Sequence, residues 1–297
     1  MQEFIDSVES VAPWFFPIFS FVIGTCIGSF LNVCIYRIPE GMSVAHPPSQ
    51  CGACGKPIPF YNNVPILAWI FLRGKAGCCG APFSIRYPAI EFLTGLLFLA
   101  SWMLLPTPQA LIGFVWISIL VCVTFIDLDH MIIPDRFSIG GLIAGLILSM
   151  VAPSIHGIPT GFVLECGIQG LFTAVLGAFI GSATILWIMI GAEVILKKEA
   201  LGFGDVKLMG AIGAFCGWQG AIFALFGGAV LGTIAIIIMQ IIRMLSPKKD
   251  SLDEEEGGMI GREIPFGPML VAGSLLYYLY FGPLIDKYFQ MFEWVLP

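Results

Sequence analysis

The sequence predicts an all-α polytopic membrane protein with about eight transmembrane helices and one Cys-rich loop domain. Composition is the first reason: of 297 residues, 58% are hydrophobic and only 11% charged, whereas soluble domains carry about 25% charged residues. The mean hydropathy of +0.92 agrees. The second reason is that apolar runs recur at lengths near the roughly 20 residues that cross a bilayer. Residues 37–87 are the only sizeable polar insertion between them.

The apolar runs can be placed in chain order. The expected spans are Val11–Tyr36, Pro88–Leu105, Gln109–Ile126, Phe137–Ile155, Gly167–Ala192, Val206–Trp218, Gly220–Ile242 and Pro265–Pro283. The sixth is the shortest and could instead be half of a re-entrant pair, since irregular backbone at membrane depth is tolerated only where it is shielded. No Lys or Arg precedes the first run, so it lacks the basic region of a cleaved signal peptide and is expected to stay in place.

Basic residues predict the topology, because Lys and Arg near span ends are retained on the cytoplasmic side. With eight spans, all but one of the 14 lysines and arginines fall on one side, and Lys287 is the exception. Dropping any span would exchange the sides of every later loop. We therefore expect both termini outside, with the chain divided into the N-terminal tail and first helix (1–36), a cytoplasmic Cys-rich loop (37–87) and a seven-helix bundle (88–297).

Four of the nine cysteines lie together in this loop: Cys51, Cys54, Cys78 and Cys79. A reducing cytosol disfavours a structural disulfide, so clustered cysteines there indicate a tetrahedral thiolate site, most often for zinc. The pattern departs from two CxxC pairs, because Ala76 stands where the second pair would begin. A knuckle without metal is the alternative, and His46 is a possible substitute ligand.

Two acidic residues border the apolar runs. Asp127 ends the third run, and Asp205 opens the sixth within the sequence Gly-Phe-Gly-Asp. Carboxylates at membrane depth are costly and indicate function. In the expected topology both lie at the cytoplasmic edge, where they can meet and share one proton because like charges at close range cannot both ionise. The ionised member would activate a water while the protonated one polarises a peptide carbonyl. We predict that Asp127 and Asp205 form the catalytic pair of an aspartic protease.

Neighbouring residues are expected to support this pair. Gly202 and Gly204 would let backbone approach closely, since a side chain there would stand in the way. Asp129 and Lys207 complete the supporting set, although Asp129, like Asp135, can also be interpreted as part of a solvated turn. Glu91, one turn into the second span, is interpreted as a partner for a cytoplasmic arginine.

Taken together, these segments resemble the bacterial type 4 prepilin peptidases, the Gly-x-Gly-Asp class of intramembrane aspartic proteases. The matching segments cover nearly the whole chain: 28–33, 36–39, the Cys51/Cys54 knuckle, 63–65, 72–75, 86–88 with Glu91, 125–135 and 201–207. The resemblance implies a multi-pass protein of the bacterial inner membrane, with its active site and Cys-rich loop facing the cytoplasm.

The resemblance also implies an activity and its reactants. The substrates would be prepilins or pseudopilins, whose basic leader is cleaved after a glycine, and the new N-terminus would be methylated with S-adenosylmethionine. Gly74 and Lys75 are the candidate residues for that cofactor. A positive leader and an apolar stem would place the scissile bond at the depth of the two aspartates.

Two other functions fit a Gly-rich bundle with polar residues. A transporter would need matching broken helices in two halves of the chain, and no such internal symmetry is found. A non-catalytic component of a pilus or secretion machine would use the zinc loop to dock partners. The expected partners are the lipid bilayer and the pilin substrates, with no nucleic acid.

Overall fold

A computed structural model describes residues 2–158, 161–197, 202–245 and 265–292. Four basic residues used for the topology lie outside them: Lys198, Lys248, Lys249 and Arg262. The described chain is helical, with elements α1 (Gln2–Val11), α2 (Phe15–Arg37), η1 (Phe60–Asn63), α3 (Leu67–Phe71), α4 (Arg86–Leu104), α5 (Thr107–His130), α6 (Asp135–Val151), η2 (Pro153–His156), α7 (Val163–Leu196), α8 (Phe203–Leu245), α9 (Gly267–Leu276), η3 (Tyr277–Phe281) and α10 (Gly282–Phe292).

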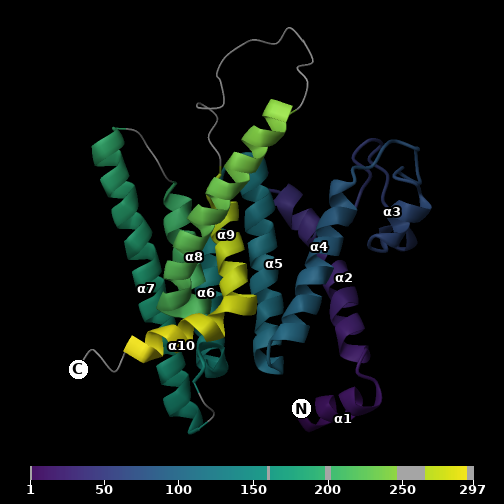
Figure 1. Cartoon of the computed structure of the whole chain (residues 1–297). Helices are drawn as coiled ribbons and strands as arrows, with labels where there is room; N and C mark the ends of the chain where they lie inside the picture. Colours follow the sequence, from purple (N-terminus) through teal and green to yellow (C-terminus); the bar gives the residue numbers. More distant parts are fainter. Residues whose placement is uncertain (1, 159–160, 198–201, 246–264, 293–297) are drawn as a thin grey trace.

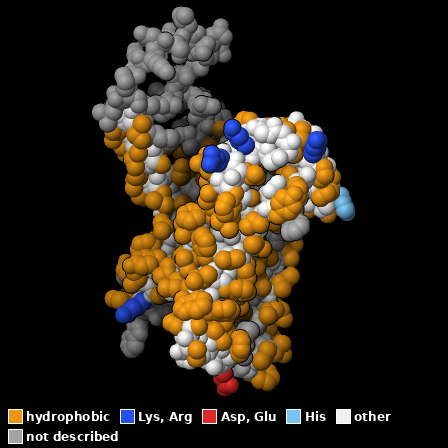
Figure 2. All heavy atoms as spheres, turned by 90° about the vertical axis from the view of Figure 1, so that its right-hand side faces the viewer, with side chains coloured by type: hydrophobic (Ala, Val, Ile, Leu, Met, Phe, Trp, Pro, Cys, Tyr) orange, Lys and Arg blue, Asp and Glu red, His pale blue; other side chains and the backbone are white. Residues whose placement is uncertain are grey.

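Among the described residues, 6 helices are long and apolar enough to cross a membrane: α2, α4, α5, α7, α8 and the run Gly267–Ile285 that begins with α9. The prediction of an all-α polytopic membrane protein is confirmed. Figure 2 shows a broad band of apolar side chains over the bundle, with Lys and Arg gathered on the loop domain at one end. The fourth expected span corresponds to α6, which has only 17 residues. The count of eight spans and their orientation stay predictions.

The sixth and seventh expected spans form one element, α8, which is broken at Gly217. Its φ of 69° and ψ of −179° lie in a region that essentially only glycine occupies. The two halves form a hairpin (Figure 1), because Gly181 of α7 lies against both Met209 before the break and Ala221 after it. The sequence placed this boundary at Gln219, two residues late, because the apolar pattern runs on through the break.

Close helix contacts use small residues, as expected where lipid supplies no hydrophobic drive between helices. A Cβ on Gly24 of α2 would lie 2.8 Å from Gly95 Cα of α4. In the core, the Trp116 ring stacks on Phe215 with centroids 4.2 Å apart. The Trp116 indole N–H donates a hydrogen bond to Ser274 of α9. These contacts join α5, α8 and α9, the helices that carry the site described next.

Candidate active site and metal centre

Asp127 and Asp205 lie at the same end of the bundle, where α5 ends and α8 begins (Figure 1). Both are buried, with exposed fractions of 5% and 7%. Met131 ends α5 in the left-handed conformation, at a φ of 53°, and its N–H donates to the carbonyl of Asp127. The chain therefore turns at Met131 toward α6, and Asp127 stays inside the bundle.

Each carboxylate accepts a hydrogen bond from a glycine N–H. Gly202 donates to Asp205 Oδ2 at 3.2 Å, and Gly267, at the start of α9, donates to Asp127. The two carboxylates are close enough for a Coulombic interaction between them. Both aspartates thus lie buried at one end of the bundle, each bonded to a glycine amide, and their role as a catalytic pair stays a prediction.

Ile133 packs between the segments that carry the pair. A Cβ on Gly204 would lie 3.2 Å from Ile133 Cβ, and a Cβ on Gly267 would lie 3.3 Å from Ile133 Cδ1. The Cβ on Gly267 would also overlap Asp127 Oδ2. Sequence reasoning missed Gly267, although a glycine followed by Pro268 at the start of an apolar run was a detectable helix-start signal.

The neighbouring charges are held in ion pairs away from the two aspartates. The two terminal guanidinium nitrogens of Arg86 donate hydrogen bonds to the carboxylate oxygens of Asp129, at 2.8 Å and 2.5 Å. Lys207 bonds Asp135 at 2.6 Å, joining the start of α8 to the start of α6. The two residues expected to support the catalytic pair thus connect helices at this end of the bundle.

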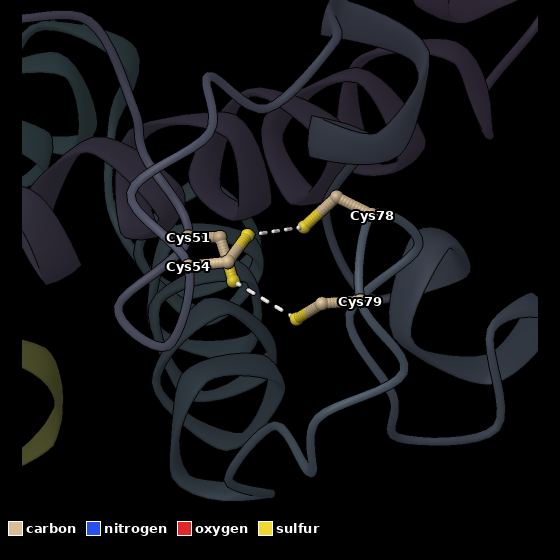
Figure 3. A group of neighbouring side chains, drawn as sticks. All are labelled: Cys51, Cys54, Cys78 and Cys79. Atoms are coloured by element: carbon tan, nitrogen blue, oxygen red, sulfur yellow. Dashed lines mark hydrogen bonds between the residues drawn. The ribbon is translucent and has the colours of Figure 1, made fainter.

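The four loop cysteines converge, and their sulfur atoms all lie within 4.8 Å of one another. The Sγ atoms of Cys51 and Cys79 are 3.7 Å apart, and those of Cys54 and Cys78 are 3.3 Å apart (Figure 3). In a tetrahedron with Zn–S bonds of about 2.3 Å, sulfur atoms are separated by about 3.8 Å. His46 is not a member of this group.

Two matching turns hold the cysteines. Around the first pair, the Cys51 N–H donates to Lys56 O and the Gly55 N–H donates to Cys51 O. In the second turn, the Ala76 N–H donates to Ala81 O and the Gly80 N–H donates to Ala76 O. Ala76 thus occupies the place of Cys51, and Cys78 occupies the place of Ala53. The adjacent cysteines both reach the cluster because Cys78 enters from a different position of the turn.

Electrostatics fit a bound cation. Backbone N–H groups of Cys54 and Ala53 lower the pKa of the Cys51 thiol to about 6. Hydrogen bonding with Cys54 and Cys51 raises the pKa of the Cys78 thiol to about 12, because a thiolate there would face others. Four thiolates can be held together only if a cation compensates their charge, and a tetrahedral set of sulfurs is the donor set of structural zinc.

Comparisons with known proteins show the family. Residues 22–105 match the family of the Bacterial Peptidase A24 N-terminal domain. Residues 114–237 match the Type IV leader peptidase family. The chain belongs to the type IV leader peptidase family. Its relatives in this family include proteins named "Prepilin leader peptidase/N-methyltransferase".

The relative from Myxococcus xanthus is 35% identical over 82% of this chain and 69% of its own length. The relative from Aeromonas hydrophila is 33% identical over 93% of this chain and 94% of its own length. The relative from Neisseria gonorrhoeae is 31% identical over 92% and 93%. No solved structure matches the chain.

Two other predicted residues of this family member lie in the loop domain. Gly74 has a φ of 69°, and a Cβ there would lie 3.1 Å from the Trp69 ring. The Trp69 indole in turn donates to Phe83 O. Lys75 pairs with Pro82 in an isolated β-bridge at the base of the second cysteine turn. Gly74 and Lys75 therefore shape the turn that carries Cys78 and Cys79.

Proposed function

We propose that this protein is an aspartic endopeptidase of the bacterial inner membrane that removes the basic leader from prepilins or pseudopilins after a glycine. The observation that carries the proposal is the buried Asp127–Asp205 pair at one end of an apolar bundle. Membership of the type IV leader peptidase family supports it, and argues against the transporter and scaffold alternatives. The relatives' names support a second step, N-methylation of the new N-terminus.

The mechanism follows from how the pair is held. Two carboxylates in one buried site share a proton, so one is a base and the other an acid at the same pH. The base takes a proton from a water that attacks the scissile carbonyl, and the acid donates to the carbonyl oxygen. Gly202 and Gly267 hold one carboxylate each by a backbone N–H. The Lys207 ammonium is paired with Asp135. It therefore does not compete for the proton that the two aspartates share.

The division of the chain and its orientation belong to this proposal. Residues 1–36, 37–87 and 88–297 form the first helix, the Cys-rich loop and the protease bundle, and the loop faces the cytoplasm. Basic residues of the loop support that orientation, because Lys and Arg near span ends are retained on the cytoplasmic side. They are Arg37, Lys56, Arg73, Lys75 and Arg86. A basic leader would then lie beside the aspartates while its apolar stem lies in the bilayer.

The two proposed cofactors have separate roles. Zinc would be held by Cys51, Cys54, Cys78 and Cys79 and would fix the shape of a loop that has little core of its own. S-adenosylmethionine would supply an electrophilic methyl group for the N-methylation step. Gly74 and Lys75 support this step by shaping the loop.

The test is cleavage of a purified prepilin by detergent-solubilised protein. Asp127→Asn and Asp205→Asn should each lower the cleavage rate by at least about 100-fold, the lower range of general acid–base contributions. Glu193→Gln is the control, because Glu193 is an exposed carboxylate on another helix, α7. Retained cleavage in both variants, with unchanged unfolding temperatures, would contradict the assignment.

A further inference from the structure

A pocket of about 220 Å³, lined by both polar and apolar side chains, lies between α2 and the loop domain. Its wall on α2 includes Cys26, Ser29 and Val33, and its wall on the loop includes Ser49, Asn63 and Pro65. Neither aspartate, none of the four clustered cysteines and neither Gly74 nor Lys75 lines it. The pocket is therefore separate from the proposed cleavage site and from the metal centre.

A buried carboxylate, that of Glu91, contacts Ser29 in the pocket lining. Glu91 of α4 is 8% exposed. Its Oε2 accepts a hydrogen bond from the Ile66 N–H at 2.7 Å, and it also accepts one from the Ser29 hydroxyl. No ion pair joins Glu91 to an arginine among the described residues, so the expected arginine partner is not found there. A carboxylate at membrane depth is costly and indicates function.

The backbone beside Glu91 is strained. Ile66 has a φ of 60° and a ψ of −53°, and the Leu67 N–H donates to Pro65 O at 2.5 Å. This is a γ-turn of the strained, positive-φ kind, which a β-branched residue adopts only under constraint. Such strain persists where the surroundings over-determine it, and it clusters at active sites and ligand clamps. Glu91 supplies the constraint through its bond to the Ile66 amide.

The pocket lies at a boundary between apolar and polar surroundings. Val64, Leu67, Ile70 and Phe71 of the same loop segment are 43%, 52%, 55% and 80% exposed. Apolar side chains continue from the bundle onto the loop domain (Figure 2). Irregular backbone at such a depth is tolerated where it lines a cavity. A peptide with an apolar stem in the bilayer would present its polar end at this boundary.

We propose that this pocket binds the amino terminus that leader cleavage releases, and that the amine is methylated there. The inference rests on the proposed function and assigns a place to its second step. The volume fits one terminal residue, because sites for drug-sized molecules occupy about 300–1,000 Å³. Ser29 Oγ accepts a hydrogen bond from the amine while its own proton points to Glu91. Ser29 is thus the contact residue, and Glu91 is a positioning residue that acts through it.

The group transfer balances with one proton released. The terminal ammonium first loses a proton along the path from Ser29 to Glu91. The amine nitrogen then forms a bond to the methyl carbon of a sulfonium donor as the carbon–sulfur bond breaks, and that electron pair stays on sulfur. The products are a secondary ammonium, a thioether and the proton held by the enzyme.

A pocket-filling variant separates the two activities. Cys26 is an exposed free cysteine in the pocket wall, so Cys26→Phe should fill the pocket and leave the aspartates untouched. With a purified prepilin and S-adenosylmethionine, mass spectrometry should find cleavage at the wild-type rate and methylation lowered about 10-fold or more. Val22→Phe is the control, because Val22 is also exposed on α2, one turn away, and does not line the pocket.

A second variant tests the role of Glu91. Glu91→Gln keeps an oxygen for the Ile66 amide but removes the proton acceptor, so kcat for methylation should fall about 100-fold. KM for a cleaved, unmethylated pilin should change little, because Ser29 still contacts the amine. A purely structural role would raise KM and lower stability together, and that result would overturn the assignment of Glu91.

Protection of Cys26 from alkylation tests binding directly in the wild-type protein. A cleaved, unmethylated pilin should protect the Cys26 thiol, and the same pilin acetylated at its amino terminus should not. Equal protection by both peptides, or wild-type methylation by Cys26→Phe, would overturn the inference and leave the protease proposal standing. Failure of the wild-type protein to cleave a prepilin would instead contradict the proposed function.

Discussion

The two candidate sites, the buried aspartates of the bundle and the cysteine cluster of the loop, are held in different ways. Asp127 and Asp205 lie on long helices whose packing buries them, and each is fixed by a glycine amide. The loop domain has one short α-helix, α3, without a buried residue, and one 3-10 helix, η1. Its shape depends on two hydrogen-bonded cysteine turns and on polar contacts with α4. The comparison teaches that helix packing sets the geometry of the aspartates, whereas backbone hydrogen bonds in two turns set the positions of the loop cysteines.

The aspartate site of the bundle should tolerate added atoms less well than the loop domain does. In Gly267→Ala, the new methyl group would overlap Asp127 Oδ2 and displace that carboxylate. Misplacement of a catalytic group by about 1 Å costs about 100-fold in rate, so we expect cleavage to fall by that factor. Gly140→Ala in α6 is the control, because a Cβ there meets nothing within 4 Å. Prepilin cleavage assays on both variants measure the difference, and similar rates would remove Gly267 from the site.

The loop domain should be sensitive to the loss of a cysteine from its cluster. Cys78→Ala should lower the zinc content from about one ion per chain to a small fraction, because three thiolates bind a structural ion less well than four. Adding Ala76→Cys to Cys78→Ala should restore the content, since Ala76 occupies the place of Cys51 in the second turn. Metal analysis and limited proteolysis of residues 37–87 measure both effects. Zinc binding that is unaffected in Cys78→Ala would show that Cys78 is not a ligand.

The ion pair between Arg86, at the end of the loop, and Asp129 of the bundle should contribute least to stability. Arg86 and Asp129 have side-chain exposures of 42% and 30%, so their contribution is screened by solvent. A double-mutant cycle with Arg86→Ala and Asp129→Ala should give a coupling free energy below about 1 kcal/mol. The coupling should also decrease as salt concentration rises. Denaturant unfolding measures it, and a much larger coupling would mean that this pair holds the loop on the bundle.

The sequence was sufficient for several features of this protein. Hydropathy predicted the helical membrane fold, and acidic residues beside apolar runs pointed to Asp127 and Asp205 as candidates, since unneeded charges are too costly at membrane depth. The structure buries both. Cysteine spacing identified the four sulfurs that converge. These features follow from composition and local pattern, which the linear chain contains in full.

The tertiary structure alone decided how distant segments meet. Gly267 contacts Asp127 across 140 positions of the chain, and no local pattern encodes that distance. The break in α8 lies at Gly217 instead of at Gln219, and Cys78 reaches the cluster through the shape of its turn. Glu91 finds the Ile66 amide and Ser29 instead of an arginine. Packing selects these partners, because a buried polar group must take whichever donor the fold brings within reach.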